Sequence, residues 1–276
     1  MSVIRVLLKR IIPPKLIGLL LNVLNKRAIY KIRVFKLIFK PDPQNRKLNI
    51  GGGRWLVKGW ENLDWYVHDV YCDYKQNLLV NQNLPFEDSS VSRIFTSHVL
   101  EHLDDEVVLK LLKECKRVLK EGGVLRIVVP DMEKAFEAYY SNDEEFFQTG
   151  EISLVGDSIE RRFINFFASF AIENYGGQRH YSGGPIIDDN VVSKQVSTLD
   201  RYDFVKWCES LIPKQAPYIA HRNGFDYKKL RSFLEIAGFT RISRSTYKGS
   251  INPEMRGAAF DKRPKISLFI EAVNAE

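Results

Sequence analysis

The stretch that decides the fold is Asn49-Ile50-Gly51-Gly52-Gly53, which is followed shortly by Gly59-Trp60-Glu61-Asn62-Leu63-Asp64. This pattern predicts a buried strand, a glycine turn, a second strand and an acid at its end. Glycines let the backbone approach a ligand closely and adopt positive φ, where a side chain would clash. Asp64 can accept hydrogen bonds from a ribose diol, as acids at this place do in nucleotide-binding α/β sheets. The stretch therefore predicts a nucleotide-type cofactor site.

The spacing of this stretch distinguishes two cofactor classes. A dinucleotide fingerprint has glycines at the first, third and sixth places, but the sixth place here is Leu56. Gly53 and Asp64 are eleven positions apart, whereas a dinucleotide domain places about 20 between its glycine turn and its ribose acid. The interval is also too short for a full helix and a strand, so we expect a turn in place of the first helix. A nicotinamide or flavin cofactor is disfavoured.

The pattern continues downstream as strand, helix and strand. The apolar run 94–97 leads into His98-Val99-Leu100-Glu101-His102-Leu103. An amphipathic pattern over 104–119, ended by Gly122-Gly123, predicts a helix, and 124–129 reads as a buried strand. We therefore predict a β-α-β unit, which is the building block of parallel sheets.

These motifs resemble those of class I S-adenosylmethionine-dependent methyltransferases, in particular a type-11-like branch often associated with surface-polysaccharide biosynthesis. The resemblance covers about residues 47–131 and rests on the motifs at 48–53, 59–64, 84–86, 97–103 and 118–123. It implies S-adenosyl-L-methionine as the cofactor. It also implies an α/β fold with a Rossmann-like sheet that is mostly parallel and has an antiparallel C-terminal edge.

The resemblance also implies roles for individual residues. The glycine turn passes under the methionine moiety, Asp64 holds the ribose, and Asn83-Leu84 border the adenine. Asn49 stands where the family commonly has an acid that orients the methionine end, so an uncharged amide takes that place. The cofactor-binding residues that we expect are Asn49, Gly51, Gly52, Gly53, Asp64, Asn83, Leu84 and Ser97.

Methyl transfer needs an acceptor aligned with the methyl–sulfur bond, and often a base that takes the acceptor's proton. We expect His98, at the exit of the 94–97 strand, and His221, in the loop before the last helix, to be the candidate catalytic bases. His98, Glu101 and His102 stand at i, i+3 and i+4, so on a helix they could ligate one divalent metal ion. The sequence identifies no distal ligand, and we expect no metal site.

The chain leaves the core pattern after residue 140 and returns to it at residue 223. The segment 141–222 contains an aromatic run at 163–170, which helical spacing explains, and a glycine-rich stretch at 176–185. In the resembling class, the segment after the fifth strand commonly supplies the substrate lid. We therefore expect 141–222 to be a helical lid insertion that carries specificity.

The rest of the chain after residue 40 is expected to form the core of one methyltransferase domain. This domain covers 41–276, with its core at 41–140 and 223–276. An amphipathic pattern over 225–237 predicts the last helix. Two alternating segments after it predict strands that complete the antiparallel edge.

Basic residues are concentrated at the N-terminus. Residues 1–40 hold ten Lys or Arg and no Asp or Glu, which leaves 31 basic against 34 acidic residues in the rest of the chain, a net charge of −3. A nucleic-acid partner is not expected, because it would need a basic stripe on the body itself. The longest apolar stretch, 16–24, is about half of the roughly 20 residues that span a bilayer. No small-residue cleavage site follows it.

Residues 1–40 are therefore predicted to be a basic amphipathic helical extension. Three roles stay open for it: an interfacial segment on anionic lipid, a docking segment for a partner protein, or a helical cap packed on the enzyme. Three cysteines without metal-type spacing argue against a disulfide framework and for a reducing compartment. We expect a cytoplasmic protein that can associate peripherally with the inner membrane surface.

The function that we predict is O-methylation of a glycan or small-molecule acceptor. The acceptor rests on the resemblance, and a lipid-seeking extension would suit a membrane-bound acceptor. One alternative is methylation of a protein or of a quinone-type lipid head group. Another is a cofactor-binding pseudoenzyme or scaffold in a glycan-synthesis complex, which Asn49 and the shortened first helix favour.

Overall fold

The structure is a computed structural model. It describes residues 14–65, 69, 71–147, 158–168, 187–212, 220–257, 259–261 and 263–275, with side chains from residue 26 onward.

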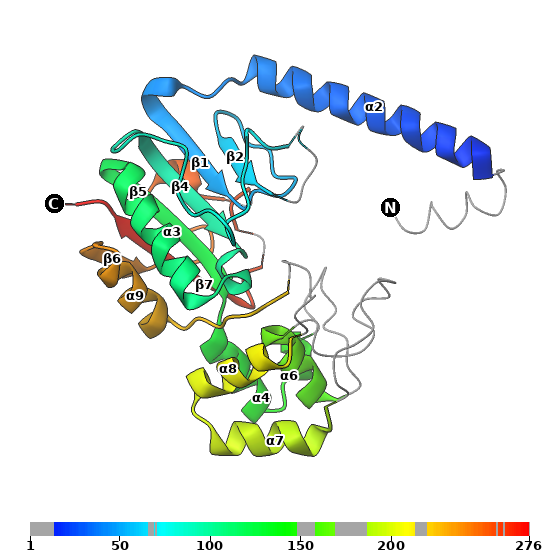
Figure 1. The fold of residues 1–276 in the computed structure, drawn as a ribbon, viewed down its shortest axis with the longest axis vertical. Helices are drawn as coiled ribbons and strands as arrows, with labels where there is room; N and C mark the ends of the chain where they lie inside the picture. Colours follow the sequence, from blue (N-terminus) through cyan, green and yellow to red (C-terminus); the bar gives the residue numbers. More distant parts are fainter. Residues whose placement is uncertain are drawn as a thin grey trace.

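In the described part of the chain, seven strands form one sheet in the order β3-β2-β1-β4-β5-β7-β6 (Figure 1). The strands are β1 (Arg46–Ile50), β2 (Glu61–Asp64), β3 (Tyr74–Lys75), β4 (Val91–Ser97), β5 (Leu119–Pro130), β6 (Arg241–Arg244) and β7 (Ser267–Val273). The neighbours among β1 to β5 pair in parallel, whereas β7 is antiparallel to both β5 and β6. The predicted Rossmann-like, mostly parallel sheet with an antiparallel C-terminal edge is confirmed.

Two helices cover one face of the sheet. They are α3 (Asp105–Val118) and α9 (Tyr227–Ile236), and they contact each other as well as the strands (Figure 1). Alternate residues of β5, Leu125, Ile127 and Val129, point into the aliphatic core beneath these helices. Because successive side chains of a strand point to opposite faces, the residues between them lie on the other side. This alternation fixes which face of β5 the helices bury.

Loops cover the opposite face of the sheet. Residues 51–60 form turns and no helix, as the short interval before Asp64 predicted. Their place is filled by an aromatic cluster of Trp55, Trp60, Phe95 and Phe260, with ring centroids 5.2 Å apart for Trp60–Phe260 and 5.6 Å apart for Trp55–Trp60. The large rings bury the apolar area that a helix would otherwise cover. The 3₁₀ turn η4 (Pro253–Met255) adds Met255 to this cluster, and another, η1 (Pro43–Asn45), directly precedes β1.

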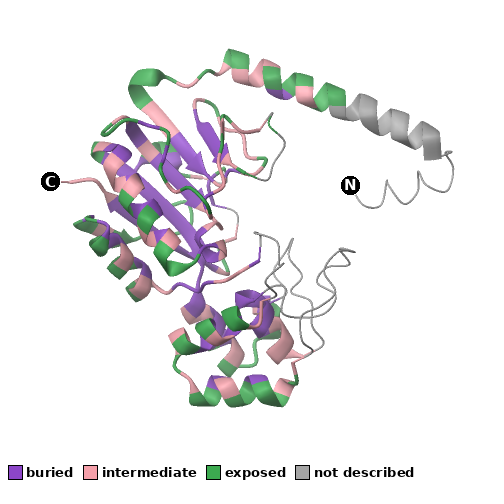
Figure 2. Cartoon of the chain, in the orientation of Figure 1, coloured by how far each residue is buried: buried purple, intermediate pink, exposed green. Residues whose placement is uncertain are grey.

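In the described ranges of 132–212, five short helices form a separate group beyond the carboxyl end of β5 (Figures 1 and 2). They are α4 (Met132–Tyr140), α5 (Glu144–Phe147), α6 (Ile159–Phe167), α7 (Asp189–Thr198) and α8 (Arg201–Ser210). Their shared core is rich in phenylalanine, and the rings of Phe163 and Phe204 stack at 5.2 Å. The helical prediction for the aromatic run is confirmed over 163–167, and the glycine-rich stretch lies outside the described residues. This group is called the lid below, and the sheet with α3 and α9 is called the body.

The N-terminal helix α2 (Pro14–Ile38) extends away from the sheet (Figure 1). Near its end it meets the body through an ion pair between Lys36 Nζ and Asp73 Oδ1, 2.9 Å apart. Lys58 also lies over the Phe39 ring, 5.2 Å from its centroid. Among the described residues, none of the helices combines the length and the apolar character needed to cross a membrane.

Candidate functional site

The glycine turn follows β1 at the carboxyl edge of the sheet. Gly51 has φ +68°, and a Cβ added to it would lie 2.1 Å from Val99 Cγ2. A Cβ on Gly52 would lie 2.8 Å from Asn49 Nδ2. Gly53 has φ +55°, but no heavy atom of the described residues lies within 4 Å of its Cβ position. The fold therefore requires the first two glycines, while the third leaves open space where a ligand can approach the backbone.

Asp64 lies at the tip of β2, as predicted, and its carboxylate faces the glycine turn. Its Oδ2 accepts a hydrogen bond from the Gly53 N–H at 2.7 Å, and its Oδ1 accepts one from the Trp65 N–H at 2.7 Å. A carboxylate oxygen can accept more than one hydrogen bond. Asp64 is therefore fixed beside the turn in a position that suits a ribose diol, and its role in binding stays a prediction.

Asn49 supports the turn from below. Its side chain is buried, and its Nδ2 donates a hydrogen bond to Asn62 Oδ1 at 3.2 Å, directly under Gly52. An aspartate at this position would have no proton for the Asn62 oxygen. The amide thus has a structural reason to stand where the resembling class commonly carries an acid.

The other predicted cofactor residues are placed differently from one another. Ser97 ends β4 at the same edge as the glycine turn. Asn83 lies beside the end of β3, where its carbonyl accepts a hydrogen bond from Gln76 Nε2 at 3.0 Å. Leu84 points into the core, and its N–H donates to the Glu114 carboxylate at 2.8 Å. The sequence did not predict this contact of Gln76, which directly follows β3, because a two-residue strand leaves no alternation to detect.

His98 follows β4 with a φ of +54°, an uncommon value for a residue with a side chain. Its Nδ1 lies 3.1 Å from Glu101 Oε1, and its Nε2 lies 3.0 Å from Ser267 Oγ. Both ring nitrogens are therefore within hydrogen-bond distance of the protein. To take a proton from an acceptor, His98 must first give up one of these contacts.

His221 comes to the same edge through a tether between two distant segments. Glu101 lies on the 3₁₀ turn η2 (Leu100–His102), and its carbonyl accepts hydrogen bonds from the N–H groups of Arg222 at 2.7 Å and Asn223 at 3.1 Å. The ring of His221 meets that of His102 edge to face, with centroids 4.9 Å apart. The structure thus places His98, His102 and His221 around the buried carboxylate of Glu101. His68 and His180 lie outside the described residues.

Burial and neighbouring charges shift two pKa values in this group. Burial alone would raise the pKa of Glu101, but the hydrogen bond from His98 and the positive charges that the histidines can carry lower it to about 2. Burial lowers the pKa of His221 to about 4, and His102 adds to this effect. At neutral pH, Glu101 is therefore ionised and the His221 ring is neutral.

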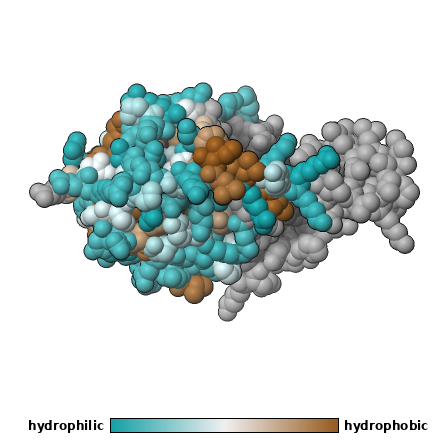
Figure 3. Space-filling model, turned by 90° about the horizontal axis from the view of Figure 1, so that it is seen from above, coloured by the Kyte–Doolittle hydropathy of each residue, from teal (hydrophilic) through white to brown (hydrophobic). Residues whose placement is uncertain are grey.

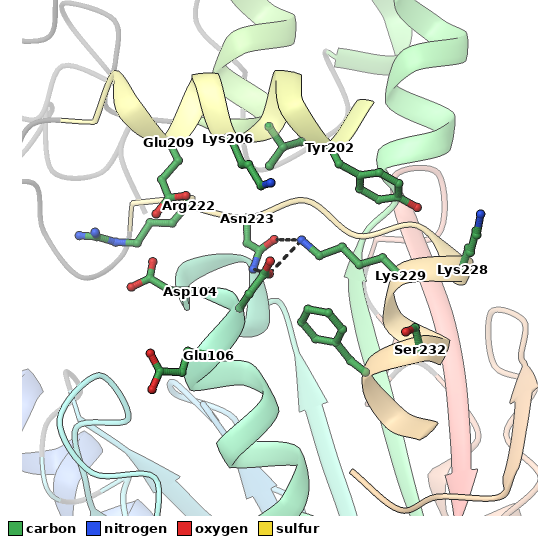
Figure 4. A pocket seen from close by; sticks show the side chains of 13 residues that line it. Asp104, Glu106, Tyr202, Lys206, Glu209, Arg222, Asn223, Lys228, Lys229 and Ser232 are labelled. Carbon is green, nitrogen blue, oxygen red and sulfur yellow. Dashed lines mark hydrogen bonds and ion pairs between the residues drawn. The ribbon is translucent and has the colours of Figure 1, made fainter. Parts of the chain in front are cut away.

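A separate cavity of about 620 Å³ lies at the junction of the lid and the body. Figure 4 shows side chains from the start of α3, from α8, from α9 and from the loop before α9 around it. In the lining of this cavity, Lys229 Nζ donates a hydrogen bond to Asn223 Oδ1 at 2.6 Å and forms an ion pair with Asp105 Oδ1 at 2.9 Å. The predicted site residues do not line this cavity, so it is distinct from the cofactor edge.

Comparisons with known proteins agree with the fold. Residues 68–127 match a family model described as "Methyltransferase domain" (Methyltransf_11). The probable tRNA methyltransferase 9B of Mus musculus is 28% identical over 134 residues, which is 44% of this chain and 29% of that protein. An uncharacterised protein of Methanocaldococcus jannaschii is 27% identical over 146 residues, which is 49% of this chain and 62% of that protein. The chain thus spans less than two thirds of either relative.

Solved structures to which the chain is similar include a SAM-dependent methyltransferase from Archaeoglobus fulgidus. It has a TM-score of 0.40 and 15% identity, and the match covers 90% of this chain and 93% of that one. A possible histamine N-methyltransferase from Thermotoga maritima has a TM-score of 0.39 and 14% identity, with 91% and 95% covered. The match over residues 68–127 and the sheet order support a SAM-dependent methyltransferase domain, a class that uses S-adenosylmethionine as its cofactor.

Proposed function

We propose that the protein transfers a methyl group from S-adenosyl-L-methionine to a hydroxyl oxygen of a glycan or another small-molecule acceptor. The observation that carries this proposal is the group of histidines around Glu101, which adjoins the glycine turn through the contact between Val99 and Gly51. A hydroxyl loses its proton when its oxygen is methylated, and imidazole is the side chain that most often accepts such a proton.

The residues of the carboxyl edge fit this cofactor. Gly53 offers its backbone beside open space, and Asp64 offers a carboxylate fixed next to it. Asn83 lies toward the third strand, on the side proposed for the adenine. When bound, the cofactor supplies an electrophilic methyl group on a positively charged sulfur. The chain itself orients the ribose through Asp64 and receives the acceptor proton at a ring nitrogen of His221 or His98.

Two features support a membrane-bound glycan acceptor. One is the resemblance to a branch associated with surface-polysaccharide biosynthesis. The other is α2, which is strongly basic and also exposes apolar side chains: Leu37 and Ile38 are each 66% exposed. The molecular face seen in Figure 3 is mostly hydrophilic, but it carries compact apolar patches. We propose that α2 rests on an anionic membrane surface, because basic and apolar side chains on one helix favour that location.

Other acceptors remain as outcomes of the test. The mouse relative is named as a probable tRNA methyltransferase, but the net charge of −3 outside residues 1–40 disfavours an RNA track on the body. Protein side chains and quinone-type head groups are further acceptor classes. A scaffold without turnover is the alternative without an acceptor.

The test uses methyl-labelled cofactor and cell extract separated into glycan, lipid, protein and RNA fractions. We expect the label in the glycan or small-molecule fraction, and it should survive mild alkali because a methyl ether does. Label that ribonuclease or protease releases, or that alkali removes as an ester, would contradict the proposal. Absence of label together with S-adenosylhomocysteine binding would favour the scaffold.

Cofactor binding is checked separately with Asp64→Ala. The variant should lose about 1.5–3 kcal/mol of S-adenosylhomocysteine affinity in calorimetry, the typical contribution of hydrogen bonds to a charged group. Asp203→Ala, which changes a surface carboxylate on α8, is the matched control and should bind as the wild type does. Equal affinities in the two variants would remove Asp64 from the site.

A further inference from the structure

We propose that Glu101, His102 and His221 bind one divalent first-row transition-metal ion, such as Zn²⁺ or Mn²⁺. One ligand atom from each of these side chains lies within 4.8 Å of the other two. The set differs from the one that sequence spacing suggests, because His221, more than a hundred residues away, takes the place of His98. The proposal therefore replaces the expectation that the protein has no metal site.

The carboxylate of Glu101 supplies the first argument. The side chain is 1% exposed, and Oε1 lies 3.1 Å from His98 Nδ1. The second oxygen, Oε2, is buried and has no hydrogen-bond partner among the described residues. A buried, ionised oxygen without a partner is costly, because nothing replaces the water that it lost on folding. A bound cation would supply the missing interaction.

The orientation of the two histidines supplies the second argument. His102 Nδ1 lies 3.2 Å from the Ala220 carbonyl oxygen, and His221 Nδ1 lies 2.7 Å from the Phe166 carbonyl oxygen. A carbonyl oxygen can only accept, so in each neutral ring Nδ1 carries the proton and the lone pair is on Nε2. Metal-binding histidines show this arrangement almost without exception, since the second hydrogen bond fixes the ring for coordination.

The ligand atoms determine which ions suit the site. Two imidazole nitrogens and one carboxylate form a set that binds Zn²⁺ and other first-row transition metals, whereas Mg²⁺ and Ca²⁺ prefer oxygen ligands throughout. Three protein ligands leave at least one coordination position for water or for a substrate oxygen. The bound ion could therefore exchange a water ligand for a substrate oxygen, as catalytic metal sites require.

The position of the site suggests what the ion does. Val99, two residues before Glu101, packs against Gly51 of the glycine turn, so the site adjoins the proposed cofactor edge. An acceptor hydroxyl that binds a metal ion loses its proton more readily, because the ion stabilises the resulting alkoxide. This role rests on the proposed methyl transfer, whereas ion binding itself does not. A coordinated His221 has no ring nitrogen left to accept a proton, so with the ion bound His98 is the base candidate of the proposed reaction.

The direct test measures binding to the full chain. Protein freed of metal by chelation is titrated with Zn²⁺ and, separately, with Co²⁺ by calorimetry and visible absorption. We expect one ion per chain, and a Co²⁺ spectrum of nitrogen and oxygen ligands without the thiolate bands that Cys72 would give. Excess Mg²⁺ should not displace the ion. Wild-type protein that binds no stoichiometric ion would overturn the proposal.

Variants then identify the ligands. His221→Ala and Glu101→Gln should weaken binding by about 100-fold or more, and His221→Gln serves as a second variant if the alanine variant does not fold. His98→Gln, which can still donate to Glu101, should lose only about tenfold, since it acts on a ligand and not on the ion. A large loss for His98→Gln with little for His221→Ala would overturn this ligand set. S-adenosylhomocysteine affinity should stay unchanged in all of them, which separates this test from that of the proposed function.

Discussion

The body and the lid bury their side chains in different ways. Under α3 and α9, the core is aliphatic and is formed by strands such as β1 and β4, whose long-range pairings fix the register. The lid core contains phenylalanines from helices of four to ten residues. Helices this short are marginal by themselves, so they depend on buried side chains to remain folded: large rings in α4, α5, α6 and α8, and Val192 and Val196 in α7. Figure 2 shows the strands of the body largely buried, whereas the lid helices are buried over only part of their length.

Among the described residues, backbone contacts near Phe225 join the two regions. Phe225 pairs with Asp131 in a single bridge, and its carbonyl accepts a hydrogen bond from the Met132 N–H at 2.9 Å. His221 adds a contact of its own, because its Nδ1 bonds to Phe166 in the lid while its ring faces Glu101 in the body. The candidate site therefore lies where two independently packed regions join.

The largest effect should come from the lid core. Phe163→Ala removes a fully buried ring that contacts Phe136 and Phe204, so we expect it to cost about 3–5 kcal/mol. Hydrogen exchange should show loss of protection in α4 and α6, while the amides of β4 and β5 remain protected. Leu111→Ala in α3 is the matched change in the body and should affect the sheet. If Phe163→Ala unprotects both regions equally, the lid and the body unfold as one unit.

The body should be most sensitive at the glycine turn. Gly51→Ala meets both a positive φ and the Val99 side chain, so we expect a loss of about 2–4 kcal/mol in urea unfolding. Gly53→Ala has the positive φ without the clash and should lose about 1 kcal/mol. The new methyl group enters the open space where the cofactor is proposed to approach the backbone. S-adenosylhomocysteine should therefore bind more weakly to Gly53→Ala than to wild type, even though the variant is nearly as stable. Similar unfolding energies for the two variants would refute the steric difference.

A smaller effect is expected at the tether formed by Asn223, which joins the loop before α9 to the start of α3. Asn223 Nδ2 donates to the Leu103 carbonyl at 3.0 Å and to Asp105 Oδ1 at 2.8 Å. Asn223→Ala should therefore cost about 1–3 kcal/mol, because it leaves a buried carbonyl without its partner. Asn190→Ala on the surface of α7 is the control. Metal affinity should fall with the Asn223 change, since His221 is two residues away, and an unchanged affinity would show that η2 holds His221 without this tether.

The smallest effect concerns pH. Partial burial of its carboxyl group raises the pKa of Glu209 in the cavity of Figure 4, although the residue as a whole is exposed, and the nearby Asp104 carboxylate raises it further. A carboxyl whose folded pKa exceeds its unfolded value stabilises at low pH, and this contribution is lost as pH rises through the folded pKa. Glu209→Gln should therefore increase the free energy of unfolding at pH 7. The gain should be less than about 1 kcal/mol, because solvent around the exposed side chain screens the charge, and thermal unfolding should show it as a slightly higher melting temperature. The difference from wild type should shrink toward pH 4, and a gain that grows on acidification would contradict the sign.

Local patterns in the sequence predicted the parts of the fold that depend on residues close together in the sequence. Strand alternation, the glycine turn and the helical spacing of the aromatic run each involve residues a few positions apart. The candidate site depends on contacts that spacing does not contain, since His221 reaches Glu101 only after the sheet and the lid have formed. The i, i+3, i+4 pattern at His98, Glu101 and His102 predicted a shared helical face. In the structure, His98 precedes η2 with a positive φ, so it contacts Glu101 from another direction.

The aromatic cluster that takes the place of the first helix has an optical consequence. Of the four tryptophans in the chain, Trp55 and Trp60 belong to this cluster and Trp65 directly follows Asp64, whereas Trp207 lies in α8 of the lid. Indole emission responds to solvent and to stacked rings, so a purine bound near Asp64 would change the fluorescence of the first three. A variant that keeps Trp207 alone would report on the lid. The chain thus carries separate intrinsic fluorophores for its two regions, and each can be followed in real time without a label.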